Sequence, residues 1–431
     1  MEVTRLMHEA EQKLKDFAQS TIIKKKYRIS DRITHFVGYG HSNTILVEGD
    51  TSLILIDSLD SNERAKRLRH EIEATTGKVV KTLIFTHGHP DHRGGSAAFQ
   101  DTVEEVIAFA PRRPLLKHTD RIQDVLNRRA SRQFGYSLTE EEVITQGLGM
   151  REGRAVKDGN YDFLVPTTIY RNEERVVREI DGVTLELISA VGETDDQLFV
   201  WLPDEKVLCC GDNFYACWPN LYAIRGGQYR DVAAWVDSLT KILSFPSVAL
   251  LPGHFQPILG EDTIRETLTN YRDAIESVLT QTIECINQGK SEDETVRSVA
   301  LPERLRDLPY LGEYYGTVQW SIRSIYHGYL GWFDGNPTNL NRVPSEVYAK
   351  EILGLISDPQ IVFDRIERLQ SKGEDQLACE LCDLLIHAEI DVKRAKKLKS
   401  ESLMTLAQRQ TSSNGRHYDI ASAYELLEEA K

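Results

Sequence analysis

Four residues within six positions have the side chains and spacing of a metal site. His87, His89, Asp91 and His92 directly follow the apolar run VVKTLIFT. A helix would scatter these side chains around its axis, whereas a tight turn after a strand can direct them to one point. Imidazole suits zinc and related ions, and a carboxylate adds a harder ligand, as in hydrolytic sites. We therefore predict a metal-binding turn at the end of a buried strand.

The segments around this motif alternate between strand and helix patterns. ITHFVGYG, NTILVEGD, SLILIDS and VEEVIAFAP predict strands, and ERAKRLRHEIEATTG predicts a helix that ends at a glycine. Strand patterns resume in VTLELIS, LFVWLP, KVLCCGD and SVALLPGH. This rhythm predicts a layered α/β domain. Residues 112–160 are polar and irregular, and we expect them to form a long insertion over the site.

The length of the chain and its net charge limit the possible domain organisation and the possible binding partners. A chain of 431 residues predicts more than one domain, and from about residue 263 the pattern stays helical to the end. We predict a catalytic domain over 1–262 and a helical domain over 263–431. The net charge of −14 argues against a nucleic-acid partner, because binding phosphates requires a basic face. Metal ions and a few arginines can still attract a small anionic substrate into one cleft.

The N-terminus and the cysteines predict a cytoplasmic protein with no membrane association. MEVTRLMHEAEQKLKDF is charged throughout and lacks the apolar core of a signal peptide. No run approaches the roughly 18 apolar residues that a membrane span needs. Cys379 and Cys382 form a CxxC inside an apolar helical pattern, which predicts buried core thiols.

The HxHxDH order of this motif is the signature of the metallo-β-lactamase superfamily, and the chain resembles that superfamily well beyond it. The resemblance implies an αβ/βα sandwich, an α/β fold with the metals at one edge. Asp57, the last residue of SLILID, resembles the early aspartate that supports a ligand, and His254, in LLPGH, resembles the late histidine ligand. Most relatives place a further histidine where this chain has Glu193.

That glutamate and a following segment resemble the alkylsulfatase branch of the superfamily. Residues 220–226 read NLYAIRG, which is similar to the NLYxxRG motif of that branch. The resemblance implies that Arg225 and Arg230 contact a sulfate group. The bridging carboxylate of the branch is usually glutamate, whereas here it is Asp212, one methylene shorter.

The resemblance implies a centre with two Zn²⁺ ions per chain. The first ion takes His87, His89 and Glu193, the second takes Asp91, His92 and His254, and Asp212 bridges them. Two such cations lower the pKa of a shared water from about 15.7 toward ~7, so a metal-bound hydroxide can attack an anionic ester. Among the ligands, we assign catalytic roles to Asp91 and Asp212. Tyr222, counted with the substrate-binding residues, and His41 are the candidates for a proton donor.

The C-terminal half resembles the alkylsulfatase dimerisation domain. YYGTV (314–318), YLGWFDGNP (329–337) and NGR (414–416) carry this similarity, which implies a homodimer. The aromatic residues of YLGWFDGNP predict packing in a core or an interface. Larger members have a further lipid-binding-like domain that is absent from these residues, so we expect a substrate other than a long alkyl sulfate.

The predicted function is hydrolysis of a sulfuric ester of an alkyl or other small organic alcohol. Two alternatives stay open, because one fold hosts many chemistries. The first is another hydrolase, such as a phosphoesterase, lactonase or thioesterase, which a panel of substrates would reveal. The second is a non-catalytic binding module, which metal analysis would reveal. A nucleic-acid hydrolase would need a basic domain, and the acidic composition predicts none.

Overall fold

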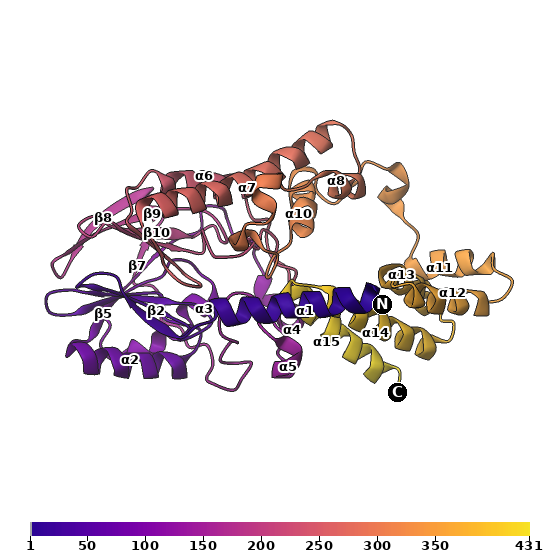
Figure 1. Ribbon diagram of the computed structural model, residues 1–431, viewed down its shortest axis with the longest axis horizontal. Helices are drawn as coiled ribbons and strands as arrows, with labels where there is room; N and C mark the ends of the chain where they lie inside the picture. Colours follow the sequence, from indigo (N-terminus) through magenta and orange to yellow (C-terminus); the bar gives the residue numbers. More distant parts are fainter. Residues whose placement is uncertain (1) are drawn as a thin grey trace.

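Two β-sheets lie face to face, with helices on both outer surfaces (Figure 1). The structure is a computed structural model, and it describes the backbone of residues 2–431 and the side chains from residue 9 onward. This arrangement confirms the predicted αβ/βα sandwich. The chain begins with the helix α1 (Glu2–Thr21), and Met1 lies outside the described residues.

The first sheet has seven strands in the order of the sequence. They are antiparallel from β1 to β4 and parallel from β4 to β7. The strands are β1 (Lys25–Arg28), β2 (Ile33–Val37), β3 (Thr44–Glu48), β4 (Leu53–Ile56), β5 (Val80–Ile84), β6 (Glu105–Phe109) and β7 (Thr168–Tyr170). Its outer face is covered by α2 (Asn62–Thr76), which ends at Gly77 with a positive φ of 67°, and by the short η1 (Ser96–Phe99). Glycine adopts that left-handed conformation without steric cost.

The second sheet has six strands, of which only β11 and β12 pair in parallel. In spatial order they are β13 (Ile258–Leu259), β12 (Ala249–Pro252), β11 (Val207–Gly211), β10 (Leu198–Leu202), β9 (Val183–Ser189) and β8 (Arg175–Ile180). Its outer face is covered by α6 (Val232–Leu243) and α7 (Glu261–Asn287). α7 is the first helix of the part that the sequence predicts to be helical from about residue 263.

The core between the sheets consists of aliphatic side chains from both inner faces. Ile54, Ile84, Val200 and Leu251 are fully buried there, because alternate residues of each strand point inward. This close packing fixes where the strands end. The residues that follow β4, β5, β9, β11 and β12 therefore meet at one edge of the sandwich, and these are the segments that contain the predicted metal ligands.

The insertion over the site differs from the irregular loop that the sequence predicts. Residues 112–160 contain α4 (Gln123–Gln133), the short α5 (Glu140–Val143) and the 3₁₀ turn η2 (Thr119–Ile122). The prediction of an irregular segment was wrong for α4, whose apolar positions are few. Leu126 and Ala130 of α4 line the cavity at the metal motif, so tertiary contacts explain this helix better than its own composition does.

The C-terminal part is helical throughout the described residues, as predicted. It comprises α8 (Glu292–Ser298), α9 (Glu303–Arg306), η3 (Pro309–Leu311), α10 (Val318–Leu330), η4 (Pro337–Asn341), α11 (Ser345–Gly354), α12 (Gln360–Ser371), α13 (Asp375–His387), α14 (Val392–Arg409) and α15 (Ser413–Glu429). Side chains of α7 and α10 join one hydrophobic cluster with α6, β10, β11 and β12. The core thus continues past residue 262, and the proposed domain boundary stays a prediction.

Two further expectations concern the helical part. Cys379 and Cys382 are buried and unpaired in α13, which confirms their reading as core thiols. Trp332, just after α10, is 72% exposed in the single chain, so of the two predicted placements, a core or an interface, packing at an interface stays a prediction. In residues 2–431, no helix combines the length and the apolar character that crossing a bilayer requires.

Candidate metal centre

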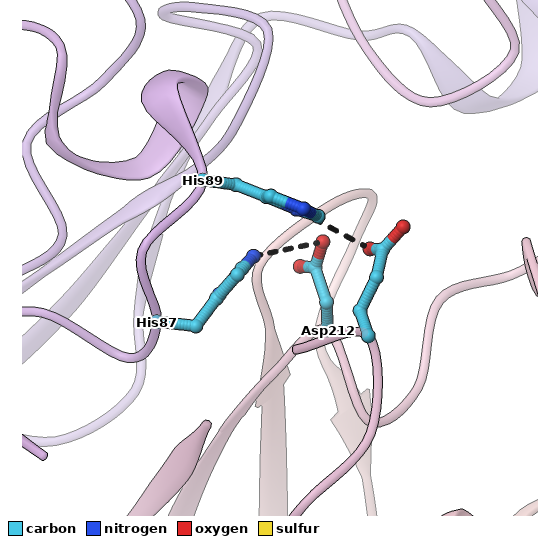
Figure 2. Close-up of side chains that lie close together, drawn as sticks. His87, His89 and Asp212 are labelled. Atoms are coloured by element: carbon cyan, nitrogen blue, oxygen red, sulfur yellow. Dashed lines mark ion pairs between the residues drawn. The ribbon is translucent and has the colours of Figure 1, made fainter. Parts of the chain in front are cut away.

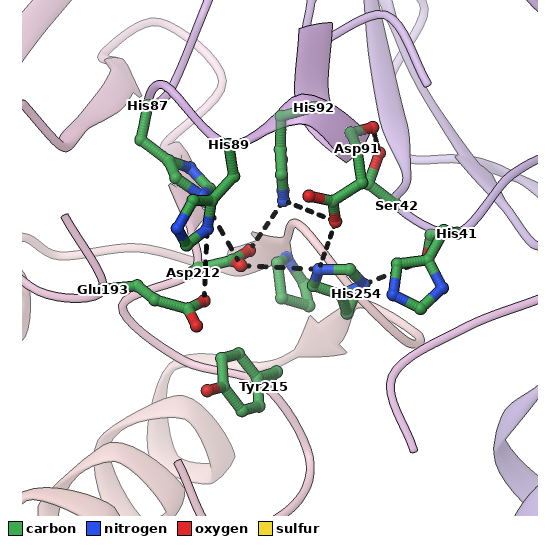
Figure 3. A network of polar contacts seen from close by, with 12 residues as sticks. His41, Ser42, His87, His89, Asp91, His92, Glu193, Asp212, Tyr215 and His254 are labelled. Carbon is green, nitrogen blue, oxygen red and sulfur yellow. Dashed lines mark hydrogen bonds and ion pairs between the residues drawn. The ribbon is translucent and has the colours of Figure 1, made fainter. Parts of the chain in front are cut away.

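The structure brings all seven predicted ligands together at the edge of the sandwich. They form two groups, and within each group the possible ligand atoms lie within 4.8 Å of one another. The first group is His87, His89, Glu193 and Asp212, and the second is Asp91, His92 and His254. Figure 3 shows these side chains converging from separate loops on one point. Residues more than 160 positions apart therefore meet because both sheets end there.

Asp212 lies between the two groups. Its Oδ2 is 3.8 Å from His87 Nε2 and 3.4 Å from His254 Nε2, and its Oδ1 is 3.3 Å from His92 Nε2 (Figure 2 shows the His87 contact). These distances are too long for the best hydrogen bonds but suit atoms that face a common ion. A bridging carboxylate is thus compatible with aspartate at this position.

Buried polar atoms without partners support this interpretation. Within the described residues, Nε2 of His87, His92 and His254 and Oδ1 of Asp212 are buried and have no hydrogen-bond partner. Leaving a buried polar group unpaired costs about 1–3 kcal/mol. Four such atoms that face one another fit divalent cations, which accept exactly these nitrogen and oxygen donors.

The other ring nitrogens of the three histidines are held by the protein. His92 Nδ1 is 2.7 Å from Asp57 Oδ2, and His254 Nδ1 is 3.0 Å from the backbone oxygen of His41. His87 Nδ1 is 3.1 Å from Thr86 Oγ1. Contacts of this kind fix the tautomer and leave Nε2 free to bind an ion. Asp57 in turn accepts hydrogen bonds from the backbone N–H and the hydroxyl of Thr86, each at 2.8 Å.

The charges of the centre reinforce one another. Burial opposes ionisation of Asp212, but the imidazoles of His92 and His254 outweigh it and hold the pKa of Asp212 well below its usual range. Burial likewise opposes protonation of His92, but Asp212, Asp91 and Asp57 raise its pKa well above the usual value. These carboxylates therefore create a strongly negative potential at the point where cations would lie.

The backbone around the centre is unusually tight. A Cβ on Gly253 would collide with Asp212 Oδ1 and lie 2.7 Å from His92 Cε1, so only glycine fits there. Asp57 and Phe255 have positive φ values of 58° and 66°. Such conformations cost about 1–3 kcal/mol each and persist only where the surrounding structure imposes them.

Arg230 makes contacts within the protein that the sequence did not predict. It is buried, its Nη1 lies 2.5 Å from Glu193 Oε1, and it also donates to the backbone oxygen of Asn220. Burial opposes ionisation of Glu193 and raises its pKa to about 7, although the positive charge of Arg230 favours the ionised form. Arg230 therefore holds a proposed ligand directly, and its contact with a sulfate group stays a prediction.

Two cavities open on the centre. The larger, of about 430 Å³, is lined by His89, Asp91, Glu193, Asp212 and Arg225, and the smaller, of about 180 Å³, by His89, Glu193, Arg225 and Arg230. Arg225 thus borders both cavities. Its guanidinium lies over the ring of Phe134, 5.7 Å from the centroid.

The two candidate proton donors occupy different places. Tyr222 lines the smaller cavity and is 36% exposed. His41 is buried beside the larger cavity, and its Nδ1 lies 2.8 Å from the backbone oxygen of Met150. That contact leaves Nε2 of His41 as the ring nitrogen available to the cavity. Both candidates therefore border a cavity of the centre.

Several residues of the site have no signal in the sequence. Ser42 donates to the backbone oxygen of Asp91 at 2.6 Å, and the amide of Asn43 donates to the backbone oxygens of Pro252 and Phe255. Both residues precede β3, and they tie the loops that contain Asp91 and His254 to each other. Only the position of GHSN at the start of a predicted strand pointed toward the site.

This fold, with two clusters of ligands at one edge of an αβ/βα sandwich, defines a metal-binding protein of the metallo-β-lactamase type. The model of the metallo-beta-lactamase superfamily matches residues 37–254, and the model of alkyl sulfatase dimerisation matches residues 291–429. A linear primary-alkylsulfatase of a Pseudomonas species is 32% identical over 88% of this chain and 73% of its own length. The chain therefore belongs to the alkylsulfatase branch of the metallo-β-lactamase superfamily.

Two other relatives agree with this placement. The alkyl/aryl-sulfatase BDS1 of Saccharomyces cerevisiae is 29% identical over 95% of this chain, which spans 65% of that relative. The solved structure of the stereoselective inverting sec-alkylsulfatase Pisa1 from a Pseudomonas species superimposes with a TM-score of 0.86 at 23% identity. The superposition covers 97% of this chain and 67% of Pisa1, and it shows the shared fold.

Proposed function

We propose that this protein hydrolyses sulfuric esters of small organic alcohols, with two zinc ions at the centre described above. The relatives that support this proposal are named as alkylsulfatases. His87, His89 and Glu193 would hold one ion, and Asp91, His92 and His254 would hold the other. Asp212, which lies between the two groups, would be shared by them.

Bound divalent cations at such a centre supply Lewis acidity and a water of lowered pKa. The chain's own residues position the reactants around them. Asp91, which lines the larger cavity, offers a carboxylate oxygen that can orient a water and accept its proton, while Asp212 stays ionised between the two groups of ligands. Asp57 and Thr86 keep His92 in the tautomer that presents Nε2. The guanidinium of Arg225 offers paired N–H groups to a sulfate, whose oxygens match that planar geometry.

One observation carries the proposal: Arg225, which has no ion-pair partner among residues 9–431, borders both cavities beside His89 and Glu193. A guanidinium beside a metal centre attracts an anionic ester rather than a neutral lactone or amide. Since a phosphate ester is also anionic, the assay has to compare the two.

The test is a panel of sulfate esters, phosphate esters, lactones and thioesters with the zinc-loaded protein. We expect sulfate esters to be turned over, and Arg225→Gln to lower kcat/KM roughly 10- to 100-fold while zinc content is unchanged. Arg128→Gln, which changes an exposed arginine of α4 that lines neither cavity, is the matched control. Turnover of phosphate esters without turnover of sulfate esters refutes the proposal, and less than one ion per chain favours a non-catalytic protein.

We also propose that the protein is a homodimer through its helical part. The match to alkyl sulfatase dimerisation supports this, as does a group of exposed apolar side chains that includes Tyr329, Trp332, Val343 and Leu355. Gel filtration with light scattering should give twice the chain's mass of 49.0 kDa, and Trp332→Asp should give the monomer. A wild-type monomer at micromolar concentration contradicts the proposal. The cytoplasmic location stays a prediction.

A further inference from the structure

The larger cavity is bordered by a row in which arginines alternate with pairs of aromatic rings. Beginning beside the metal motif, the order is Arg93, Phe163, Tyr161, Arg154, Tyr136, Phe134 and Arg225. All seven side chains line this one cavity of about 430 Å³. Phe134, Tyr136 and Arg154 belong to the insertion 112–160, and Tyr161 and Phe163 directly follow it, so the segment between β6 and β7 supplies five of the seven side chains.

The contacts along the row are continuous. The guanidinium carbon of Arg93 lies 4.8 Å from the ring centroid of Phe163, and the centroids of Phe163 and Tyr161 are 5.7 Å apart. The guanidinium carbon of Arg154 lies 4.6 Å from the ring of Tyr161 and 5.2 Å from that of Tyr136. Rings that lie against a guanidinium attract its charge and leave its N–H edge free to donate.

The row ends at Arg225. The rings of Tyr136 and Phe134 are stacked 6.0 Å apart, and Arg225 lies over Phe134. Arg225 is the arginine nearest the proposed ligands, because it borders both cavities together with His89 and Glu193. Arg154 is separated from it by two rings. The row therefore has one guanidinium at the reaction centre and another farther away, toward solvent.

Among residues 9–431, no carboxylate lies within ion-pair distance of Arg93, Arg154 or Arg225, unlike the case of their neighbours. Around the same cavities, Arg113 pairs with Asp195 at 2.8 Å and Arg230 with Glu193 at 2.5 Å. Within the described part of the chain, Arg93, Arg154 and Arg225 form no ion pair, and Nε of Arg93 is buried without any hydrogen-bond partner. Three unpaired guanidinium groups beside one cavity are notable in a chain of net charge −14.

One acidic group beside the row, Glu152, is already satisfied by hydrogen bonds. Glu152 is buried, and its Oε2 accepts hydrogen bonds from the hydroxyls of Tyr136 and Tyr161, each at 2.6 Å. Burial, with the nearby negative charge of Asp91, raises the pKa of Glu152. Glu152 thus fixes the two rings that hold Arg154, and it does not form an ion pair with that guanidinium.

A substrate with a single sulfate would use only one of these arginines. Sulfate binding occupies Arg225, and the free N–H edges of Arg154 and Arg93 would face the organic part of the ester. An uncharged alkyl chain would form no hydrogen bond with these guanidinium groups and would displace the water that solvates them, which is unfavourable. A second negatively charged group at the other end of the substrate would pair with Arg154, which is exposed to solvent.

We propose that the substrate is an organic sulfate with a second oxyanionic group, a carboxylate or another sulfate, that binds Arg154 while Arg225 binds the ester being cleaved. The proposal rests on the sulfatase function proposed above. The aromatic rings between the arginines then cover the carbon skeleton that joins the two anions. A compact, doubly charged ester is therefore the expected substrate class.

The test compares three esters of equal chain length with the zinc-loaded protein: an alkyl sulfate, its ω-carboxy analogue and the α,ω-disulfate. We expect kcat/KM to rise at least about tenfold for one or both dianionic esters, which exceeds the statistical factor of two for the disulfate. In Arg154→Gln the ratio of kcat/KM for the dianionic ester to kcat/KM for the plain alkyl sulfate should fall toward one. In Arg128→Gln this ratio should stay at its wild-type value. Whichever dianion is preferred identifies the second group.

Binding is measured separately from turnover with the corresponding alkylsulfonates, which are not hydrolysed. Calorimetry should show the ω-carboxy sulfonate binding about tenfold more tightly than the plain sulfonate, and Arg154→Gln should remove the difference. Equal kcat/KM for all three esters and equal affinity for both sulfonates overturn the inference while leaving the sulfatase function intact. Absence of sulfate turnover with zinc bound refutes the proposed function instead, and the calorimetry then still decides whether the second anion is recognised.

Discussion

Asp57→Asn tests whether the protein sets the tautomer of a metal-binding histidine. Asp57 is 3% exposed, and its Oδ2 lies 2.7 Å from His92 Nδ1. Its Oδ1 accepts the backbone N–H of Thr86 at 2.8 Å. An asparagine keeps that second contact only with its oxygen at Oδ1, which places its NH₂ group at the former Oδ2 and against His92.

The NH₂ group would then donate to His92 Nδ1. The proton of the neutral imidazole moves to Nε2, which is the atom that points toward Asp212 at 3.3 Å and cannot bind a cation while protonated. Loss of such a supporting carboxylate typically lowers metal affinity 10- to 100-fold, about 1.4 to 2.7 kcal/mol. We expect the dissociation constant of one of the two ions to rise by this factor.

The assay is competition for zinc against a chelator of known affinity, with metal content measured by elemental analysis. Asp101→Asn, which removes the charge of an aspartate paired with Arg69 on the surface, is the matched control and should bind zinc normally. Circular dichroism should show the same helix content in both variants. If Asp57→Asn binds two ions with wild-type affinity, the reasoning about the tautomer is refuted.

Two further changes test the packing of the centre and a buried acid. Gly253→Ala should lower zinc content and activity together, because its Cβ would collide with Asp212 Oδ1; wild-type zinc content in a folded variant would contradict this. Burial, only partly offset by a hydrogen bond from Gln410, raises the pKa of Asp419 to about 7, against about 3.9 in the unfolded chain. The folded state therefore holds a proton that the unfolded state has lost, and stability falls as pH rises through this window. Asp419→Asn should remove that loss. In denaturant titrations, the unfolding free energy of the variant minus that of the wild type should therefore be about 2 to 3 kcal/mol larger at pH 8 than at pH 5. The same difference at both pH values would count against this prediction.

Local patterns predicted the elements of the site. The HxHxDH motif after an apolar strand, and the strand patterns that end at Asp57, Asp212 and His254, depend only on residue type and spacing. Burial of alternate strand residues then places these ends at one edge, so the convergence of the ligands followed from the sequence together with the resemblance.

Contacts between segments that are distant in the chain could not be predicted from the sequence. The hydrogen bond between Arg230 and Glu193, and the exposure of Trp332, depend on how loops and helices pack, because arginine and tryptophan suit either a surface or an interior. The helical state of α4 likewise follows from the cavity that it covers.

The sequence by itself determined the fold class and the chemistry of the ligands, since periodicity and ligand type are local properties of the chain. Only the tertiary structure decided which charges remain unpaired around the cavity. Whether Arg154 meets a carboxylate, a ring or solvent depends on residues brought together by packing, and no spacing along the chain specifies that. Those contacts determine which substrate binds, because recognition depends on where the hydrogen-bond donors lie in space and not on their order in the sequence.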